Sequence, residues 1–174
     1  MRRLTALLAL VAFAALPMVA RATESLADRQ ATQAKVRATL DSYGQSDAGI
    51  TFHQVEKNPF NFAGTLSNGL KNSDMLEAVV AVTNDDTINV IVYPHVDGKY
   101  VNIVKSKHAA ALARKLLELN YRTFFFWGAD DTDDVYASYK FTLESGYPED
   151  SLRTALTSIP LLDQFVSEFR PYAF

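Results

Sequence analysis

The chain has 174 residues, no cysteine, and 17 Lys and Arg against 20 Asp and Glu, which gives a formal net charge of −3. The absence of cysteine excludes disulfides, thiolate metal sites and a cysteine nucleophile. The acidic balance argues against nucleic acid and anionic lipid surfaces as partners, because both are bound by clustered Lys and Arg.

The first 22 residues have the pattern of a secretory signal peptide. Two arginines precede an apolar run over residues 4–19, and Ala20-Arg21-Ala22 fits an A-x-A cleavage site. An uncleaved membrane anchor is the alternative, but the run is short for a span of about 20 residues and contains Pro17. We expect a periplasmic or secreted protein that starts at Thr23 and keeps no membrane anchor. Its formal charge falls from −3 to −6, because the removed segment carries three arginines and no acid.

Residues 23–58 predict one helix and a lead-in to a sheet. Apolar side chains recur at helical spacing over Leu26–Tyr43, and Gly44 followed by Ser46-Asp47-Ala48-Gly49 is expected to close the helix. The alternation over Ile50–His53 predicts a short edge strand. The length of the mature chain suits one core, so we expect this segment to form one folded unit with residues 59–174.

Four strands and their turns come next. The turns are Asn84-Asp85-Asp86 and Asp97-Gly98, both typical of hairpins. Such short connections favour antiparallel pairing. Strands are expected at residues 59–66, 76–82, 88–93 and 100–104.

A helix and a hairpin follow over residues 106–143. The segment SKHAAALARKLLELN carries one apolar stripe at helical spacing, with Ser106 as the expected N-cap and Asn120 as the expected stop. Residues 123–127 and 135–143 are the expected strands of the hairpin, and the second alternates strictly between apolar and polar positions.

The last segment predicts a helix that starts near Pro148 and breaks or restarts at Pro160. The element order is therefore α-β-β-β-β-α-β-β-α. This order predicts an α+β fold in which one antiparallel sheet packs against helices.

The aromatic run Phe124-Phe125-Phe126-Trp127 is the candidate interaction site. Neighbouring residues of a strand face opposite sides, so if Phe124 and Phe126 meet the helices, Phe125 and Trp127 project from the other face. There they would join Tyr136 of the second strand. Two interpretations stay open: a helix covers these side chains as core, or Phe125, Trp127 and Tyr136 contact a second copy or another protein.

The sequence contains no motif for catalysis or for binding a metal or cofactor. The acidic loop over residues 130–134 lacks the D-x-D-x-D-G spacing and the distal Glu of a calcium site, so we interpret it and Asn84-Asp85-Asp86 as turns. His53, His95 and His108 are far apart and lack the H-x-x-x-H spacing of a zinc site. We predict no catalytic residue, cofactor or metal. The alternative is a hydrolase or metal-dependent enzyme whose site is assembled from dispersed His, Asp and Tyr residues.

The chain resembles the YbjN family over residues 60–169. The resemblance rests on the element order and on Leu119-Asn120 at a helix end, the strand Val135-Tyr136-Ala137-Ser138-Tyr139, Gly146 after it, and Leu152 and Phe165 in the terminal helix. The family is described as bacterial sensory-transduction regulators, and the resemblance implies a fold like that of the type III secretion chaperones. It implies no catalytic or cofactor residues. We therefore expect an exported, non-enzymatic protein-binding or regulatory module that acts on a protein partner or as a homodimer.

Overall fold

The computed structural model describes residues 25–174. The predicted signal peptide and the predicted mature start at Thr23 lie outside this range. Within residues 25–174, no helix has both the length and the apolar character that crossing a membrane requires.

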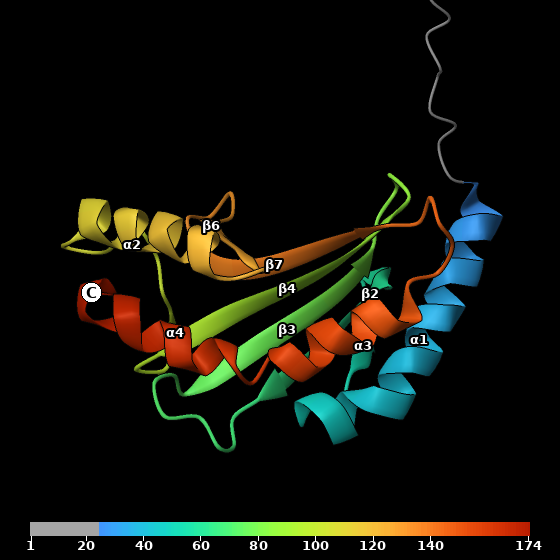
Figure 1. The fold of residues 1–174 in the computed structure, drawn as a ribbon, viewed down its shortest axis with the longest axis horizontal. Coiled ribbons are helices and arrows are strands. Elements are labelled where there is room, and N and C mark those ends of the chain that lie inside the picture. Colours follow the sequence, from blue (N-terminus) through green and yellow to red (C-terminus); the bar gives the residue numbers. More distant parts are fainter. Residues whose placement is uncertain (1–24) are drawn as a thin grey trace, which may run out of the picture.

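The described chain has the predicted α+β fold, with four α-helices and a seven-stranded antiparallel sheet (Figure 1). The sheet order is β1-β2-β3-β4-β7-β6, and β5 pairs with the end of β4. The strands are β1 (His53–Val55), β2 (Asn58–Leu66), β3 (Met75–Val82), β4 (Thr87–Val96), β5 (Lys99–Tyr100), β6 (Phe126–Ala129) and β7 (Val135–Thr142). The helices are α1 (Leu26–Ala48), α2 (Ala109–Arg122), α3 (Glu149–Ser158) and α4 (Leu162–Phe169), followed by a 3-10 turn, η1 (Arg170–Tyr172).

Helix α1 continues through Gly44 and ends at the last residue of the predicted closing stretch. Gly44 itself does not stop the helix, because this glycine has a packing role. A Cβ atom at Gly44 would lie 2.8 Å from the carbonyl oxygen of Ile50 and 2.9 Å from the ring of Phe52, so the returning chain crosses the helix there. The helix ends at Gly49, whose φ of +70° is the left-handed conformation typical of a helix terminus.

Three of the predicted strands differ from the observed ones. The strand predicted over residues 123–127 is β6, which begins only at Phe126 and ends at Ala129. The short edge strand β1 begins after Ile50 and Phe52, whose side chains are buried in the core. The strand predicted over residues 100–104 is reduced to the two residues of β5. The chain leaves the sheet there because the Asn102 side chain donates hydrogen bonds of 2.8 Å to Thr132 O and to the Asp134 carboxylate, which tie it to the loop between β6 and β7.

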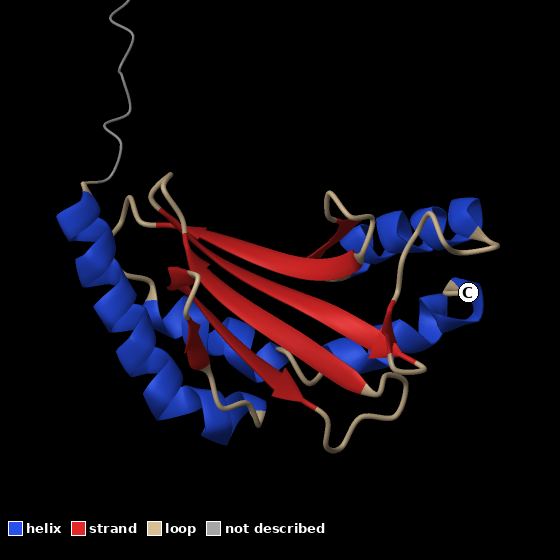
Figure 2. Ribbon diagram, turned by 180° about the vertical axis from the view of Figure 1, so that it is seen from behind, coloured by secondary structure: helices blue, strands red, loops and turns tan. Residues whose placement is uncertain are grey.

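One face of the sheet is covered and the other is not. Helices α3 and α4 lie across β3 and β4 on one side (Figure 1), and none of the described helices covers the opposite side (Figure 2). The alternation along β3 fits this arrangement, since Glu77 and Val79 are half-buried between fully buried neighbours. The covered face and the helices share a core that includes Leu76, Ala78, Val80, Val90, Val92, Leu152, Leu156, Ile159, Val166 and Phe169.

The predicted helix ends agree only in part with the observed ones. The predicted interruption at Pro160 is confirmed, since it lies between α3 and α4. The predictions for α2 are wrong at both ends. Ser106 caps nothing in the helix, because its hydroxyl donates to Tyr172 O and accepts from His108 N–H. Asn120 lies inside the helix, and its side chain has another use, described below.

Candidate functional site

The aromatic run before and in β6 is divided between two environments. Phe125 and Trp127 are buried, with 2% and 1% of their surface exposed, whereas Phe124 and Phe126 are 53% and 56% exposed. The alternation itself was predicted, but the assignment of the faces is wrong. Phe125 and Trp127 therefore belong to the core, and the accessible aromatic side chains are Phe124 and Phe126.

The register of β6 against β7 explains this reversal. Trp127 pairs with Ala137 and Phe126 pairs with Ser138, and paired residues of antiparallel strands share a face. The Asn120 side chain of α2 donates to Trp127 O at 3.0 Å and accepts from Trp127 N–H. The ring of Phe169 in α4 lies 5.4 Å from the indole. Helix contacts thus pull Trp127 inward, and the predicted facing was one residue out of register.

Tyr136, the third predicted contact residue, does reach the surface. It is half-buried on the uncovered face of the sheet, and its ring meets Tyr93 edge-on at 6.1 Å. Gly128 pairs with Tyr136, and a Cβ atom at Gly128 would lie 2.9 Å from the ring of Phe126. Phe126 therefore lies over this glycine and beside Tyr136. Of the three predicted residues, only Tyr136 is on a surface that a partner can reach.

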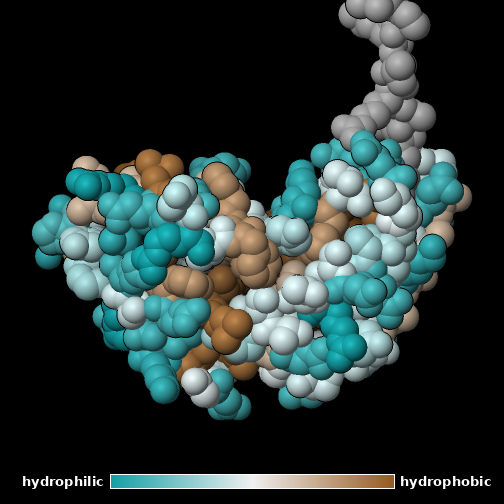
Figure 3. All heavy atoms as spheres, in the orientation of Figure 1, coloured by the Kyte–Doolittle hydropathy of each residue, from teal (hydrophilic) through white to brown (hydrophobic). Residues whose placement is uncertain are grey.

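On the helix side of the sheet, Phe124 lines two cavities, which we together call the aromatic cleft. The ring of Phe124 lies 5.3 Å from that of Tyr139 in β7, edge-on. One cavity, of about 240 Å³, is shared with Tyr139, Ser151 and Thr154, and the other, of about 190 Å³, is shared with Leu161 and Phe165, among others. In Figure 3, hydrophobic residues gather in the hollow between the lobe of α2 and the lobe of α1 and α3.

The cation that lines the smaller cavity of the aromatic cleft, Arg122, has an acidic partner, since it lies 2.6 Å from Glu168. This ion pair adds no net charge at the margin of the cleft. Leu161 is 58% exposed at the same margin. The cleft is therefore suited to an apolar group of a partner rather than to a charged one.

A polar cluster on the uncovered face is the second candidate site. His95 Nε2 lies 3.4 Å from Glu77 Oε2, and the Tyr100 hydroxyl donates to the same oxygen at 2.5 Å. The rings of His95 and Tyr100 are 4.1 Å apart, and Tyr93 stands edge-on to Tyr100 at 5.9 Å. The fold thus collects an imidazole, a carboxylate and two phenols that are dispersed in the sequence, the kind of set that acid–base chemistry uses.

The two phenols of this cluster both have a raised pKa. The hydrogen bond to Glu77 and burial raise the pKa of Tyr100 to about 12, and burial together with Asp130 raises the pKa of Tyr93 to about 12. Both phenols are therefore protonated donors at neutral pH. A cavity of about 470 Å³ reaches Tyr100, and another of about 460 Å³ reaches Glu77, but His95 lines neither. A substrate in either cavity would meet one member of the cluster at a time.

The other histidines lie elsewhere. His53 lines the cavity of Glu77 from β1, and His108 lies at the start of α2 with its ring 6.4 Å from that of Tyr172. Over residues 25–174 no group of three or more His, Asp or Glu side chains is arranged to hold a metal ion. His53 thus shares a cavity with one member of the polar cluster, whereas His108 lies against Tyr172 instead.

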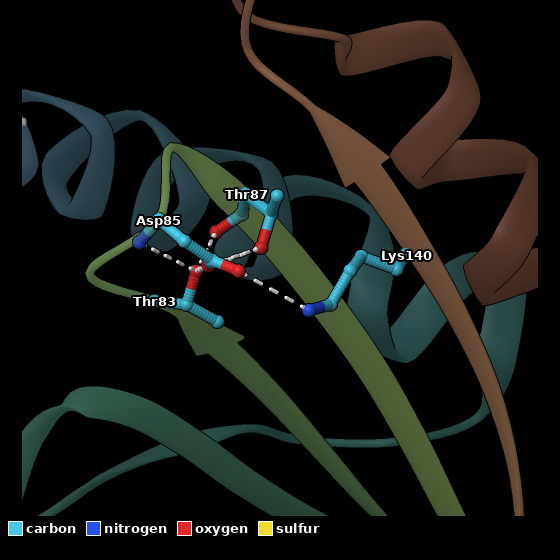
Figure 4. Close-up of polar contacts among 4 residues, drawn as sticks. All are labelled: Thr83, Asp85, Thr87 and Lys140. Atoms are coloured by element: carbon cyan, nitrogen blue, oxygen red, sulfur yellow. Dashed lines mark hydrogen bonds and ion pairs between the residues drawn. The ribbon is translucent and has the colours of Figure 1, made fainter. Parts of the chain in front are cut away.

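The acidic loops use their carboxylates to hold their own turns. Asp85 accepts from Thr83 and Thr87 and faces Lys140 (Figure 4). The hydroxyl of Thr83, then that of Thr87, and the charge of Lys140 lower the pKa of Asp85 to about 2. Asp130 similarly accepts from the backbone N–H groups of residues 132 and 134. Both loops are thus turns, as their sequences predict.

Asp163 is an important residue that the sequence analysis missed. It is 6% exposed, and its carboxylate accepts from the backbone N–H groups of Lys71, Asn72 and Ser73 and from the Ser73 hydroxyl. An acid at the start of α4 fits the helix dipole, which was the only local indication. The carboxylate of Asp163 fastens the loop before β3 to α4, the helix that forms one wall of the aromatic cleft.

Comparison of the chain with protein-family models, with curated proteins and with solved structures finds no match. Membership of the YbjN family therefore stays a prediction from the sequence.

Proposed function

We propose that this protein is an exported, non-enzymatic module of YbjN type that binds another protein through the aromatic cleft. The observation that carries the proposal is the position of Phe124. This large apolar side chain is 53% exposed and lines two cavities. Contact with a partner would remove it from water, which is energetically favourable. Aromatic side chains next to unfilled apolar pockets are typical anchors of protein interfaces.

A hydrolase or other acid–base enzyme is the second candidate, because His95, Glu77 and Tyr100 are in contact. It is the weaker one. His95 lines neither of the cavities that its partners reach, and the two phenols have a pKa of about 12. These contacts also have a structural role, because the hydrogen bond from Tyr100 to Glu77 joins β5 to β3.

The proposal is tested by capturing partners from an envelope extract with the wild-type protein and two variants. Phe124→Ala removes the anchor of the cleft. Tyr121→Ala is the matched control, since Tyr121 is an aromatic residue that is 94% exposed on α2 and lines neither cavity. We expect the wild type and the control to retain the same partner and Phe124→Ala to lose it. Equal capture by all three proteins would refute the role of the cleft.

A further inference from the structure

The outer edge of β7 is only half covered. Strand β6 pairs with residues 135–138 of β7, whereas β4 pairs on the other side with residues 137–142. In Figure 1, β7 visibly continues beyond the end of β6. Residues 139–142 therefore have a neighbouring strand on one side only.

The backbone alternation shows which groups face this open edge. Leu143 N–H donates to Asp86 O at 2.9 Å, on the side of β4. In an antiparallel strand the direction of N–H and C=O changes at each residue, so those of Lys140 and Thr142 point away from β4. Among residues 25–174, no backbone hydrogen bond reaches either residue from the segment 123–125 that leads into β6. The edge therefore offers two sets of unpaired donors and acceptors.

A cavity lies directly beside this edge. Tyr139 of β7 shares the 240 Å³ cavity with Phe124 and with Ser151 and Thr154 of α3. Side chains of a strand alternate between its two faces. A strand added along residues 139–142 would therefore direct every second side chain toward the helix side, where the cavity lies.

We infer that the free edge of β7 takes up an extended segment of another polypeptide as an additional strand. The inference rests on the proposed function and gives it a mode of binding. A segment that pairs with the backbone groups of Lys140 and Thr142 must be extended. The rings of Phe124 and Tyr139 favour apolar side chains at alternate positions of that segment. Lys140 on the free edge is paired with Asp85, and Arg122 at the margin of the cleft is paired with Glu168, so binding should change little with salt.

The side chain of Lys140 does not close the edge. Lysines often protect exposed strand edges from pairing. Here the Lys140 ammonium is directed to Asp85 in the turn between β3 and β4 (Figure 4), so it lies over the sheet rather than along the free edge. Lys140 and Thr142, whose backbone groups face the open edge, are both exposed residues.

The test uses a fluorescein-labelled peptide, Ser-Thr-Leu-Thr-Phe-Thr-Val-Thr-Ser, whose binding is followed by fluorescence anisotropy. A second probe carries N-methyl groups on alternate backbone nitrogens, in both possible phases. Lys140→Pro removes an N–H that faces the open edge and is not used by the ladder to β4, a position where an edge strand accepts proline. Lys140→Thr is the matched control, because it removes the charge and keeps the N–H.

We expect the unmodified peptide to bind the wild type and Lys140→Thr equally. Binding should weaken about tenfold for Lys140→Pro and for one phase of N-methylation, as loss of a hydrogen bond predicts. The methylated probes test the same ladder without altering the protein, so the result does not depend on how well the proline variant folds.

The outcomes separate this inference from the proposed function. Binding that requires Phe124 but ignores N-methylation and Lys140→Pro would overturn strand addition and leave the cleft as a binding site. Absence of peptide binding would also overturn strand addition, while partner capture that depends on Phe124 would still support the proposed function. A dimer in sedimentation that Lys140→Pro dissociates would assign the edge to a second copy and overturn the inference of a foreign segment.

Discussion

The carboxylate of Asp163 accepts hydrogen bonds from both the backbone N–H and the hydroxyl of Ser73, at 2.8 and 2.6 Å, across a sequence separation of 90 residues. The same carboxylate accepts from the N–H groups of Lys71 and Asn72. One buried anion thus satisfies three consecutive backbone donors that would otherwise lack partners. It fixes the position of α4, which carries Phe165 into the aromatic cleft.

Replacing Asp163 should destabilise the fold strongly. Asp163→Ala removes the acceptor of the donors of residues 71–73, of which Ser73 is buried and Asn72 half-buried, and this should lower the free energy of unfolding by about 3 kcal/mol. Urea denaturation measures the loss. Asp131→Ala is the control, because Asp131 is an exposed loop residue, and its effect should stay within about 0.5 kcal/mol. A change for Asp163→Ala as small as that of the control would contradict the role of the buried carboxylate.

The contribution of Asp163 should also depend on pH. Burial raises the pKa of this carboxyl, but the hydrogen bonds from Ser73 and from the backbone of residues 71–73 outweigh it, so the pKa is lowered overall. The charged form is therefore favoured by folding. Its contribution is complete above the ordinary pKa of about 3.9 and is lost as the pH falls through the lower value in the folded protein.

The comparison of the wild type with Asp163→Asn tests this sign. The difference in their free energies of unfolding should be constant from about pH 7 to pH 5. It should shrink below about pH 4, which is close to the pKa of a free carboxyl. A difference that grows on acidification would show that the carboxyl is neutral in the folded protein.

Local patterns in the sequence were sufficient for the element order, the hairpin turns and the break at Pro160, because each depends on neighbouring residues. They failed where a distant contact decides. Gly44 resembles a helix stop but is a packing position for Ile50. The facing of Trp127 is set by Asn120 and by Phe169, which lies in α4. The aromatic cleft was missed for the same reason, since its other wall comes from α3 and α4.

The exported form should begin at Thr23. This prediction rests on the two N-terminal arginines, the apolar run over residues 4–19 and the Ala20-Arg21-Ala22 site. N-terminal sequencing of the protein from the periplasm or the medium measures it directly. Recovery of an uncleaved chain in the membrane fraction would instead indicate an anchor.

Protein purified without chelator should contain no stoichiometric metal. The acids most able to bind one, Asp85 and Asp130, already accept hydrogen bonds within their own turns. Elemental analysis after dialysis checks this expectation. One equivalent of zinc or calcium that survives dialysis would contradict it and would revive the enzyme hypothesis. Asp85→Asn and His95→Gln would then show whether the turn or the polar cluster binds the ion.

The reversal of faces in the aromatic run leads to the sharpest test of the fold. Trp127→Ala should lower the free energy of unfolding by roughly 3–5 kcal/mol, because the indole is 1% exposed and packs against Phe169. Phe126→Ala should stay within about 0.5 kcal/mol, because this ring is 56% exposed on the uncovered face.

Urea denaturation of both variants with the wild type provides the measurement. The adjacent position makes Phe126 a close control, since both substitutions remove an aromatic ring from β6 and leave the backbone pairing with β7 intact. If Phe126→Ala proved the more destabilising of the two, the strand would face the other way. The helices α2 and α4 would then cover Phe124 and Phe126, and the aromatic cleft would not exist as a binding site.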